Sequence, residues 1–291
     1  MTGKRTSPAS SHDLPLDQEI ALEYVRYLVE SSVDDTPDAR RDFCEQRGHH
    51  QKLLHNNPHI RSIESLFGRR SSIERLGDMT LREYLRYHHY YLHQGYRYGV
   101  PRLQQKWLGH DIIKTPQDCW VYQEIIFETR PDVIVELGVM FGGATHFYAS
   151  MLDLVGSGEV LGIDVTLAKA KPPENRRITY IEGSSTSEEI LAEVRVRTRG
   201  KRVLVIADSD HEKNHVLAEL HAYAPFVNLG GYFIVEDSLN DVMGFHPVPN
   251  EGPQAAVRVF LAENDAFAVD RRWCERYVMT LNPDGFLRRV K

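Results

Sequence analysis

The chain has 291 residues, of which 42% are hydrophobic and 26% are charged, and this composition excludes wholesale disorder. Its formal net charge of −6 disfavours a protein that binds nucleic acid through a general basic surface. No apolar run of about 18 residues occurs and the N-terminus lacks the apolar segment of a signal peptide, so we expect neither a membrane span nor secretion. Three widely spaced cysteines, Cys44, Cys119 and Cys274, argue against a disulfide framework and favour a reducing cytoplasm.

Residues 1–115 are predicted to form a mainly helical N-terminal extension. Apolar residues recur with helical spacing between Leu16 and Val33, and a second helix is predicted from Thr80, where Thr80 and Glu83 have the spacing of a capping box. Polar, turn-rich segments between them indicate short helices and loops. The extension holds 9 of the 14 histidines and 8 of the 14 tyrosines, which distinguishes it from the rest of the chain.

Residues 116–291 are predicted to form a doubly wound α/β domain. From Pro131 onward, short runs rich in Val and Ile alternate with helical patterns. We predict strands at Val133–Leu137, Val160–Asp164, Ile178–Ile181, Val203–Asp208 and Tyr232–Glu236. We predict helices at about 143–154, 187–197, 213–224 and 254–263. Strands this apolar are buried on both faces, which indicates a parallel sheet with helices on both sides.

The first predicted strand ends in a glycine-rich turn, VELGVMFGGAT. Gly138 allows a sharp turn close to a ligand, and Gly142 and Gly143 do the same at the start of the next helix. Met140 stands where the dinucleotide fingerprint G-x-G-x-x-G has its second glycine. Glu136, just before the turn, suits an ammonium group better than a pyrophosphate. These features favour S-adenosylmethionine (SAM), which carries an ammonium and no phosphate.

The next two strand ends add polar residues to the same edge of the sheet, where ligands bind in open parallel sheets. Asp164, at the tip of the second strand, can bind ribose hydroxyls, but a nucleoside of either SAM or NAD would satisfy it. Ser184 and Ser185 follow the third strand and can contact adenine or ribose. A helix N-cap at Ser185 or Ser187 is the simpler interpretation of this segment.

Three carboxylates are predicted to meet at the ends of the fourth and fifth strands. Asp208 ends one strand, and Glu236 and Asp237 end the next. Unpaired, they would repel one another, and a hard divalent cation such as Mg²⁺ (or Mn²⁺) resolves that conflict. His211 lies three residues beyond Asp208, where a neutral imidazole can accept a proton from a hydroxyl.

His211 to His215 also match H-E-x-x-H, the pattern of zinc metalloproteases. That chemistry needs both histidines inside one helix and a third ligand elsewhere. Here the first histidine lies at the start of a helix, directly after a buried strand that ends in Asp208. We therefore reject the zinc interpretation.

The residues collected above resemble the cephalosporin hydroxylase/rhamnosyl O-methyltransferase family, a branch of the class I SAM-dependent methyltransferases. The resemblance spans about Trp107 to Lys291. Three segments carry it: KWLGHDIIKTPQDCWVYQEIIFETRPDVIVELGVMFGGAT, ADSDHEKNHVLAELHAYAPFVNLGGYFIVED and GPQAAVRVFLAENDAFAVD…TLNPDGFLRRV. Members of this family look like metal-dependent O-methyltransferases of natural products, including macrolide sugar methyltransferases.

The resemblance implies roles for the residues named above: contact with SAM for Glu136, Gly138 and Asp164, and binding of Mg²⁺ by Asp208, Glu236 and Asp237. It implies that His211 is the general base. It further implies a Rossmann-like sheet of seven strands, mainly parallel, whose last strand, GFLRRVK, runs antiparallel. The N-terminal extension of such enzymes contributes substrate contacts and oligomer interfaces, so we expect a homo-oligomer.

The segment Ser238–Pro253 is long for a loop in a compact domain and lies next to the predicted metal acids. Loops of this kind usually act as lids or recognise substrates. Asn240, Asp241 and His246 are its candidates for contacts with sugar hydroxyls.

The leading hypothesis is a SAM- and Mg²⁺-dependent O-methyltransferase that acts on a small molecule, a sugar of a glycosylated antibiotic-type metabolite. The alternative is an NAD(P)-dependent oxidoreductase on the same kind of sheet, which Glu136, Met140 and the absence of an obvious Tyr-x-x-x-Lys pair disfavour. A third hypothesis, a non-catalytic nucleotide-binding or scaffold protein, leaves the cluster of acids without a purpose.

Overall fold

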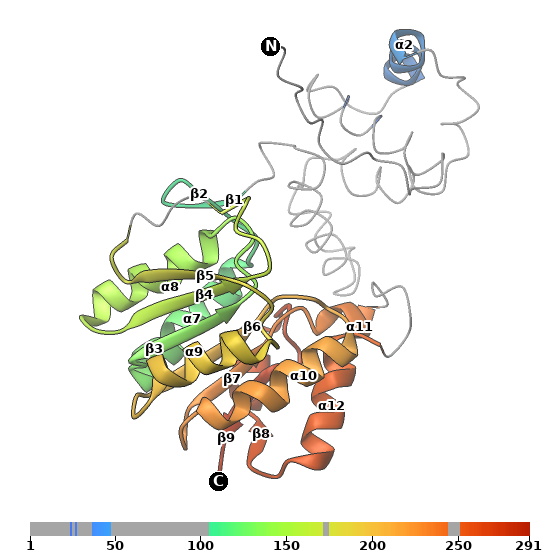
Figure 1. Cartoon of the computed structure of the whole chain (residues 1–291). Helices are drawn as coiled ribbons and strands as arrows, with labels where there is room; N and C mark the ends of the chain where they lie inside the picture. Colours follow the sequence, from blue (N-terminus) through green and yellow to red (C-terminus); the bar gives the residue numbers. More distant parts are fainter. Residues whose placement is uncertain (1–23, 25–26, 28–36, 48–104, 171–174, 244–250) are drawn as a thin grey trace. The chain divides into compact units, whose positions relative to one another are not determined.

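The computed structural model of the chain describes residues 24, 27, 37–47, 105–170, 175–243 and 251–291 (Figure 1). The chain divides into two compact units, Met1–Tyr87 and His88–Lys291, and each is described by itself. Among the described residues, no helix has the length and apolar character needed to cross a membrane.

In the N-terminal unit, a short helix forms part of an aromatic cluster. Helix α2 (Pro37–Arg47) carries Phe43, whose ring centroid lies 5.2 Å from that of Tyr24 and 5.5 Å from that of Tyr27. Both tyrosines are helical, as the helix expected between Leu16 and Val33 requires. The rest of that helix, and the one expected from Thr80, lie outside the described residues.

The larger unit is built on a seven-stranded sheet with the strand order β5-β4-β3-β6-β7-β9-β8. The strands are β3 (Val133–Leu137), β4 (Glu159–Asp164), β5 (Ile178–Glu182), β6 (Val203–Ala207), β7 (Tyr232–Val235), β8 (Phe267–Val269) and β9 (Phe286–Arg289). Strands β3 to β7 run parallel, and β9, the last strand, runs antiparallel to both neighbours. The predicted class I methyltransferase fold is therefore confirmed.

Two strands end one residue earlier than the sequence predicts. β6 ends at Ala207 and β7 at Val235, so Asp208 and Glu236 belong to the loops that follow. Beyond the strand ends the carboxylates of both acids bind Lys114, while their N–H groups still donate to the Leu137 and Ala207 carbonyls of the neighbouring strands. The acids therefore stand at the carboxyl edge of the sheet.

Helices cover both faces of the sheet (Figure 1). One face packs against α9 (Glu188–Thr198), α10 (Lys213–Tyr223) and α12 (Pro253–Glu263), and the other against α7 (Pro116–Thr129), α8 (Gly143–Val155) and α13 (Arg271–Glu275). The strand residues between these layers are almost all buried. The four helices predicted from about 143, 187, 213 and 254 agree with the observed ones to within one residue at each end.

The sequence analysis did not predict α7 or the hairpin before it. Strands β1 (Gln105–Trp107) and β2 (His110–Ile112) pair antiparallel, and the indole N–H of Trp107 donates to Ser150 Oγ of α8 at 3.0 Å. Helix α7 begins at Pro116, and the hydroxyl of Thr115 accepts from the Asp118 N–H as its N-cap. These elements precede Pro131, where the alternating pattern of the sequence begins.

The segment Ser238–Pro253, expected to be a long loop, contains the short helix α11 (Leu239–Met243). Residues 244–250, with His246, lie outside the described residues. Asp241 accepts hydrogen bonds from the backbone N–H groups of Gly252 at 3.0 Å, Gln254 at 2.7 Å and Ala255 at 3.2 Å. Both of its carboxylate oxygens are thus engaged at the start of α12, so in this structure Asp241 caps a helix.

We predict that Asp241→Ala lowers the free energy of unfolding by about 1–2 kcal/mol, because the N–H groups at the start of α12 lose their acceptor. Urea unfolding measures the change, and Asp265→Ala is the matched control because the exposed side chain of Asp265 pairs with Lys291 at the surface. Unchanged stability of Asp241→Ala would contradict the capping role.

Candidate functional site

A cavity of about 860 Å³ opens at the carboxyl ends of the parallel strands. Residues that follow β3, β4, β5 and β6 line it, together with Asp237 after β7 and the segment 111–114. This is the edge where open α/β sheets bind ligands. Of the residues predicted from sequence to form the site, it contains Glu136, Gly138, Gly143, Asp164, Ser185, Asp208, His211 and Asp237.

The glycine-rich turn after β3 is closely packed against neighbouring backbone. Gly138 has φ +95°, and a Cβ there would lie 2.0 Å from the carbonyl oxygen of Asp208. A Cβ on Gly143 would lie 2.0 Å from the carbonyl oxygen of Asp111. Only glycine fits at either position. The turn therefore packs the β3 end against the β6 end, and the start of α8 against the backbone of Asp111.

Glu136 is a buried carboxylic acid at the end of β3, and its side chain belongs to the cavity wall. The hydroxyl of Thr145 donates to its Oε2. Burial raises the pKa of Glu136 to about 8, because a carboxylate with so little solvation is disfavoured. A ligand that brings a positive charge to this acid would stabilise its ionised form.

Asp164 connects the end of β4 to the glycine-rich turn. Its Oδ2 accepts from the N–H groups of Val139 at 2.8 Å and Met140 at 3.0 Å, and its Oδ1 accepts from the N–H of Thr166 at 3.0 Å. Since each carboxylate oxygen has two lone pairs, Oδ1 keeps the capacity for one further hydrogen bond. Asp164 both fixes the turn and offers an acceptor to the cavity.

Two of the predicted contact residues do not line the cavity. Gly142 is the N-cap residue of α8, with φ +80°, and a Cβ there would lie 2.5 Å from the Tyr180 hydroxyl. The Ser184 hydroxyl lies 3.2 Å from that of Thr186. Ser187 is the N-cap of α9, as the simpler interpretation of this segment anticipated. Of this serine pair, Ser185 alone is in the cavity wall.

Asp208, His211 and Asp237 form a cluster whose nearest ligand atoms all lie within 4.8 Å of one another. His211 Nε2 is 3.4 Å from Asp208 Oδ1 and 3.4 Å from Asp237 Oδ2. His211 precedes α10, whereas His215 lies inside it and contacts Glu219 at 3.2 Å. The two histidines of the H-E-x-x-H match therefore contact different carboxylates: Asp208 and Asp237 for His211, and Glu219 for His215.

Glu236 lies next to this cluster in sequence but has other partners. Its Oε2 accepts from Lys114 Nζ, and its Oε1 accepts from the hydroxyls of Tyr122 at 2.9 Å and Tyr148 at 3.3 Å. Lys114 Nζ also donates to Asp208 Oδ2 at 2.7 Å. The buried ammonium thus neutralises Glu236, which stays outside the Asp208–His211–Asp237 cluster in this structure. Its role as a metal ligand remains a prediction.

Lys114 is the site residue that the sequence analysis missed. Its side chain is only 4% exposed, yet its partners lie 94 and 122 residues further along the chain. A single lysine before a helix cap carries no pattern that marks such a contact. Only the approach of β2 and α7 to the carboxyl edge of the sheet makes it part of the site.

Neighbouring charges determine whether Asp208 and His211 are protonated. Burial alone would raise the pKa of Asp208, but the Lys114 ammonium and His211 hold it well below its ordinary value. Burial likewise opposes protonation of His211, but Asp237 and Asp208 outweigh it and raise the pKa of His211 to about 9. Without a bound cation, His211 is therefore an imidazolium at neutral pH.

The backbone of Asp237 is held in an unfavourable conformation. Its φ of 54° lies in the left-handed region, which residues with a Cβ rarely adopt. The Asp237 N–H donates to Asn282 Oδ1 at 2.9 Å, and Asn282 Nδ2 donates to the Tyr122 hydroxyl at 2.7 Å. Strain of this kind persists where surrounding contacts impose it, often at functional sites. Here it coincides with the carboxylate that faces His211.

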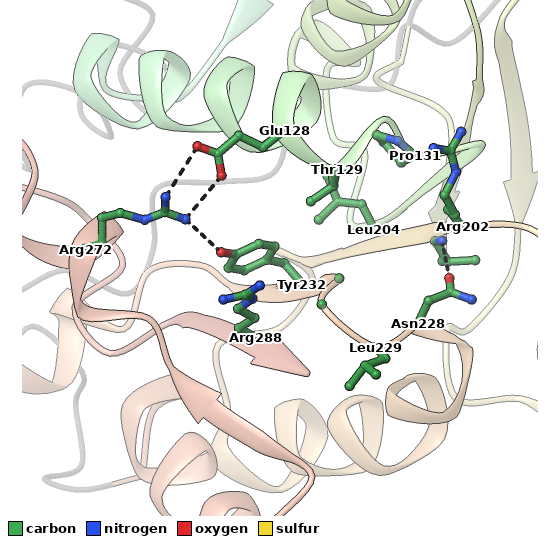
Figure 2. Close-up of a pocket in the computed structure, with 13 residues that line it drawn as sticks. Glu128, Thr129, Pro131, Arg202, Leu204, Asn228, Leu229, Tyr232, Arg272 and Arg288 are labelled. Atoms are coloured by element: carbon green, nitrogen blue, oxygen red, sulfur yellow. Dashed lines mark hydrogen bonds and ion pairs between the residues drawn. The ribbon is translucent and has the colours of Figure 1, made fainter. Parts of the chain in front are cut away.

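A second hollow, of about 250 Å³, lies at the amino ends of β6 and β7 (Figure 2). Arg272 contacts Glu128 at 3.2 Å and the Tyr232 hydroxyl at 3.3 Å. Arg202, in the same wall, pairs with Asp132 at 2.9 Å. These charges already satisfy one another, so we assign the functional site to the larger cavity at the opposite edge.

Comparison with known proteins agrees with the fold and identifies the family. The family model described as Rhamnosyl O-methyltransferase/CmcI matches residues 101–290. A rhamnosyl O-methyltransferase of Mycobacterium tuberculosis strain H37Rv is 31% identical over 206 residues, which cover 67% of this chain and 82% of the relative. One from Mycobacterium leprae is 32% identical over 191 residues, which cover 62% and 81%.

A solved structure of CmcI, titled with Mg and SAM, superimposes with a TM-score of 0.52 at 26% sequence identity, over 64% of this chain and 77% of that one. The chain therefore belongs to the rhamnosyl O-methyltransferase/CmcI family and is an O-methyltransferase. These relatives give no support to the alternative of an NAD(P)-dependent oxidoreductase.

We predict that Glu136→Gln removes a pH dependence from the stability of the free protein. Because the pKa of Glu136 is about 8 in the folded chain against an ordinary 4.5, the folded state keeps a proton that the unfolded chain has lost. This group therefore lowers stability as pH rises from about 4.5 to 8. The melting temperature of Glu136→Gln, relative to the unmodified protein, should be higher at pH 8 than at pH 5.

Glu193→Gln is the control for this comparison, since Glu193 pairs with Arg197 on an exposed turn of α9. Its melting temperature should follow that of the unmodified protein at both pH values. An equal difference for Glu136→Gln at pH 5 and pH 8 would show that the acid is not kept neutral by burial.

Proposed function

We propose that this member of the rhamnosyl O-methyltransferase/CmcI family transfers the methyl group of SAM to a sugar hydroxyl of a small glycosylated metabolite of the antibiotic type. One observation carries the proposal: a buried acid suited to an ammonium and a cluster of two carboxylates with a histidine line the same cavity. The mycobacterial relatives are named rhamnosyl O-methyltransferases, which supports a sugar hydroxyl as the acceptor.

SAM fits the part of the cavity between β3 and β4. Glu136 offers a buried carboxylate whose ionisation a bound ammonium would favour, and Asp164 Oδ1 offers an acceptor for a ribose hydroxyl. Val139, Met140 and Phe141 of the glycine-rich turn also line the cavity. CmcI, the solved relative, is described with SAM, which supports the same cofactor for this chain.

The Asp208–His211–Asp237 cluster fits Mg²⁺ (or Mn²⁺), since hard cations prefer carboxylate oxygens. Asp208 and Asp237 would hold the ion, with Glu236 as the further ligand that the resemblance implies. A bound divalent cation would supply positive charge that lowers the pKa of the acceptor hydroxyl and offsets the carboxylates that raise the pKa of His211. CmcI is likewise described with Mg.

His211 is the proposed general base. Its Nε2 lies between the carboxylates of Asp208 and Asp237, which hold the ring in place as it takes the proton of the acceptor hydroxyl. The acceptor oxygen then attacks the methyl carbon of SAM. The new C–O bond forms as the C–S bond breaks, and the electron pair of the C–S bond stays on sulfur. Asp208 and Asp237 stabilise the imidazolium that results.

Lys114 has a positioning role in this mechanism. Its ammonium fixes Asp208 and Glu236 from the side of α7, so the carboxylates are oriented before ligands arrive. Burial alone would lower the pKa of Lys114, but the carboxylates of Asp208 and Glu236 outweigh it and raise that pKa well above its ordinary value, so the ammonium stays charged. It therefore does not compete with His211 for the proton of the acceptor.

We predict that His211→Ala lowers kcat by about 10²–10⁴-fold, the range for loss of a general base. SAM affinity should hardly change, since His211 faces the carboxylates. Steady-state kinetics and calorimetry with SAM measure the two quantities. His221→Ala is the control, because His221 lies further along α10 and pairs with Glu263 at the surface. Equally small losses in both variants would remove the base from the mechanism.

We predict that chelation with EDTA abolishes methyl transfer and that excess Mg²⁺ restores it. Binding of S-adenosylhomocysteine should survive chelation, because Glu136 and Asp164 lie outside the Asp208–His211–Asp237 cluster. Asp237→Asn should require more Mg²⁺ for half-maximal activity. Turnover that persists in EDTA, or a stoichiometric zinc that is lost on His215→Ala, would overturn the assignment of the metal.

A further inference from the structure

Lys114 joins the cavity wall to a carboxylate that lies behind it. Its side chain is only 4% exposed, and its Nζ donates both to Asp208 Oδ2 at 2.7 Å and to Glu236 Oε2. Asp208 lines the cavity, whereas Glu236 does not. One buried ammonium therefore stands between the Asp208–His211–Asp237 cluster and a further acid at the next strand end.

No other positive charge is in contact with Glu236 among the described residues. Its Oε1 accepts from the hydroxyls of Tyr122 at 2.9 Å and Tyr148 at 3.3 Å. Burial raises the pKa of Tyr122 and of Tyr148 well above the ordinary value, so both phenols stay neutral. Compensation of the charge on Glu236 therefore depends on Lys114.

The three acids at these strand ends share two positive groups. Lys114 contacts Asp208 and Glu236, and His211 lies 3.4 Å from a carboxylate oxygen of Asp208 and of Asp237. Removal of Lys114 would leave one more negative charge uncompensated in a region that is largely shielded from water. A bound divalent cation is a ligand that would relieve this excess of negative charge.

Lys114 and a metal ion would need the same carboxylates. An ion held by Asp208 would lie near the Lys114 ammonium, and like charges repel most strongly where water is scarce. If Glu236 also became a ligand, the ion would have to take the oxygen that Lys114 now holds. The lysine therefore opposes metal binding whether Glu236 joins the ligands or keeps its present partners.

Lys114 also orients Asp208, and this effect has the opposite sign. Asp208 is held independently of the lysine, because its N–H donates to the Leu137 carbonyl oxygen at 2.8 Å. Much of its orientation should therefore survive without Lys114. The charge of the lysine, by contrast, has no substitute beside Glu236 in the part of the chain that the structure describes. We expect the effect of charge to be the larger one.

We propose that Lys114 is a built-in counter-cation that substitutes for the metal ion: it keeps the acidic end of the site folded when no ion is bound, and it lowers the affinity of the site for Mg²⁺. This inference rests on the proposed function, because it concerns the metal site of the same cavity. A lysine that only oriented the carboxylates would instead raise that affinity.

The first measurement is thermal unfolding in EDTA and in excess Mg²⁺. In EDTA, Lys114→Met should melt at a lower temperature than the unmodified protein. Mg²⁺ should raise its melting temperature by more, because stabilisation by a ligand grows with the affinity of the ligand. Lys201→Met is the matched control, since Lys201 lies outside the cavity and pairs with Glu159 at 2.8 Å. Its response to Mg²⁺ should equal that of the unmodified protein.

The second measurement is calorimetry with Mg²⁺ alone. The dissociation constant for Mg²⁺ should be lower by about tenfold or more in Lys114→Met than in the unmodified protein. Lys114→Arg keeps the positive charge and should not show this gain in affinity. Neither measurement depends on methyl transfer.

Weaker or unchanged binding of Mg²⁺ by Lys114→Met would overturn the inference and leave the lysine its positioning role alone. Folding of Lys114→Met in Mg²⁺ but not in EDTA would support it. If this variant folds in neither, Lys114→Gln, which keeps hydrogen-bond donors without the charge, decides by the same measurements, and its failure to fold in Mg²⁺ would overturn the inference. Absence of Mg²⁺ binding by the unmodified protein and by every variant would refute the metal of the proposed function itself.

Discussion

The ion pairs of one buried lysine hold the acidic end of the site together. Lys114 donates to Asp208 Oδ2 at 2.7 Å and to Glu236, although these acids belong to the loops after β6 and β7 and not to its own segment. The buried carboxylate of Glu236 and the half-buried one of Asp208, at adjacent strand ends, would repel each other without an intervening positive charge. Removal of the lysine would leave that repulsion uncompensated, so Asp208 could not keep its position beside His211.

The position of Lys114 depends in turn on how α7 is attached to the sheet. Thr115 caps this helix, and the carboxylate of Asp118 accepts from the Thr280 hydroxyl at 2.5 Å and the Leu281 N–H at 3.0 Å. The same stretch supplies Asn282, which holds Asp237. The hydrogen bonds between α7 and residues 280–282 therefore help to position two parts of the site. They anchor the helix that follows Lys114, and they hold the backbone of Asp237.

The predictions from sequence succeeded where one element carries the whole signal. The runs of Val and Ile from 133 and 203 specify buried parallel strands by themselves, and the acids that follow them mark the functional edge. Lys114 could not be found this way, because its role depends on partners 94 and 122 residues further along the chain. Glu236 shows the same limit: its position at a strand end is visible in the sequence, but its pairing with Lys114, Tyr122 and Tyr148 is not.

Helix α10 explains why a zinc-protease motif occurs in a methyltransferase. His211 lies before the helix, where the loop after β6 brings it between Asp208 and Asp237. His215 and Glu219 lie inside the helix four residues apart, so they share one face and contact each other toward Ser185. The two histidines of the motif therefore belong to different parts of the cavity wall. His211 lies in the Asp208–His211–Asp237 cluster, and His215 lies four residues further along, beside Ser185 and Glu219. His211 directly precedes α10 and His215 lies on it, so the packing of α10 on the sheet determines how far apart these two parts of the cavity wall lie.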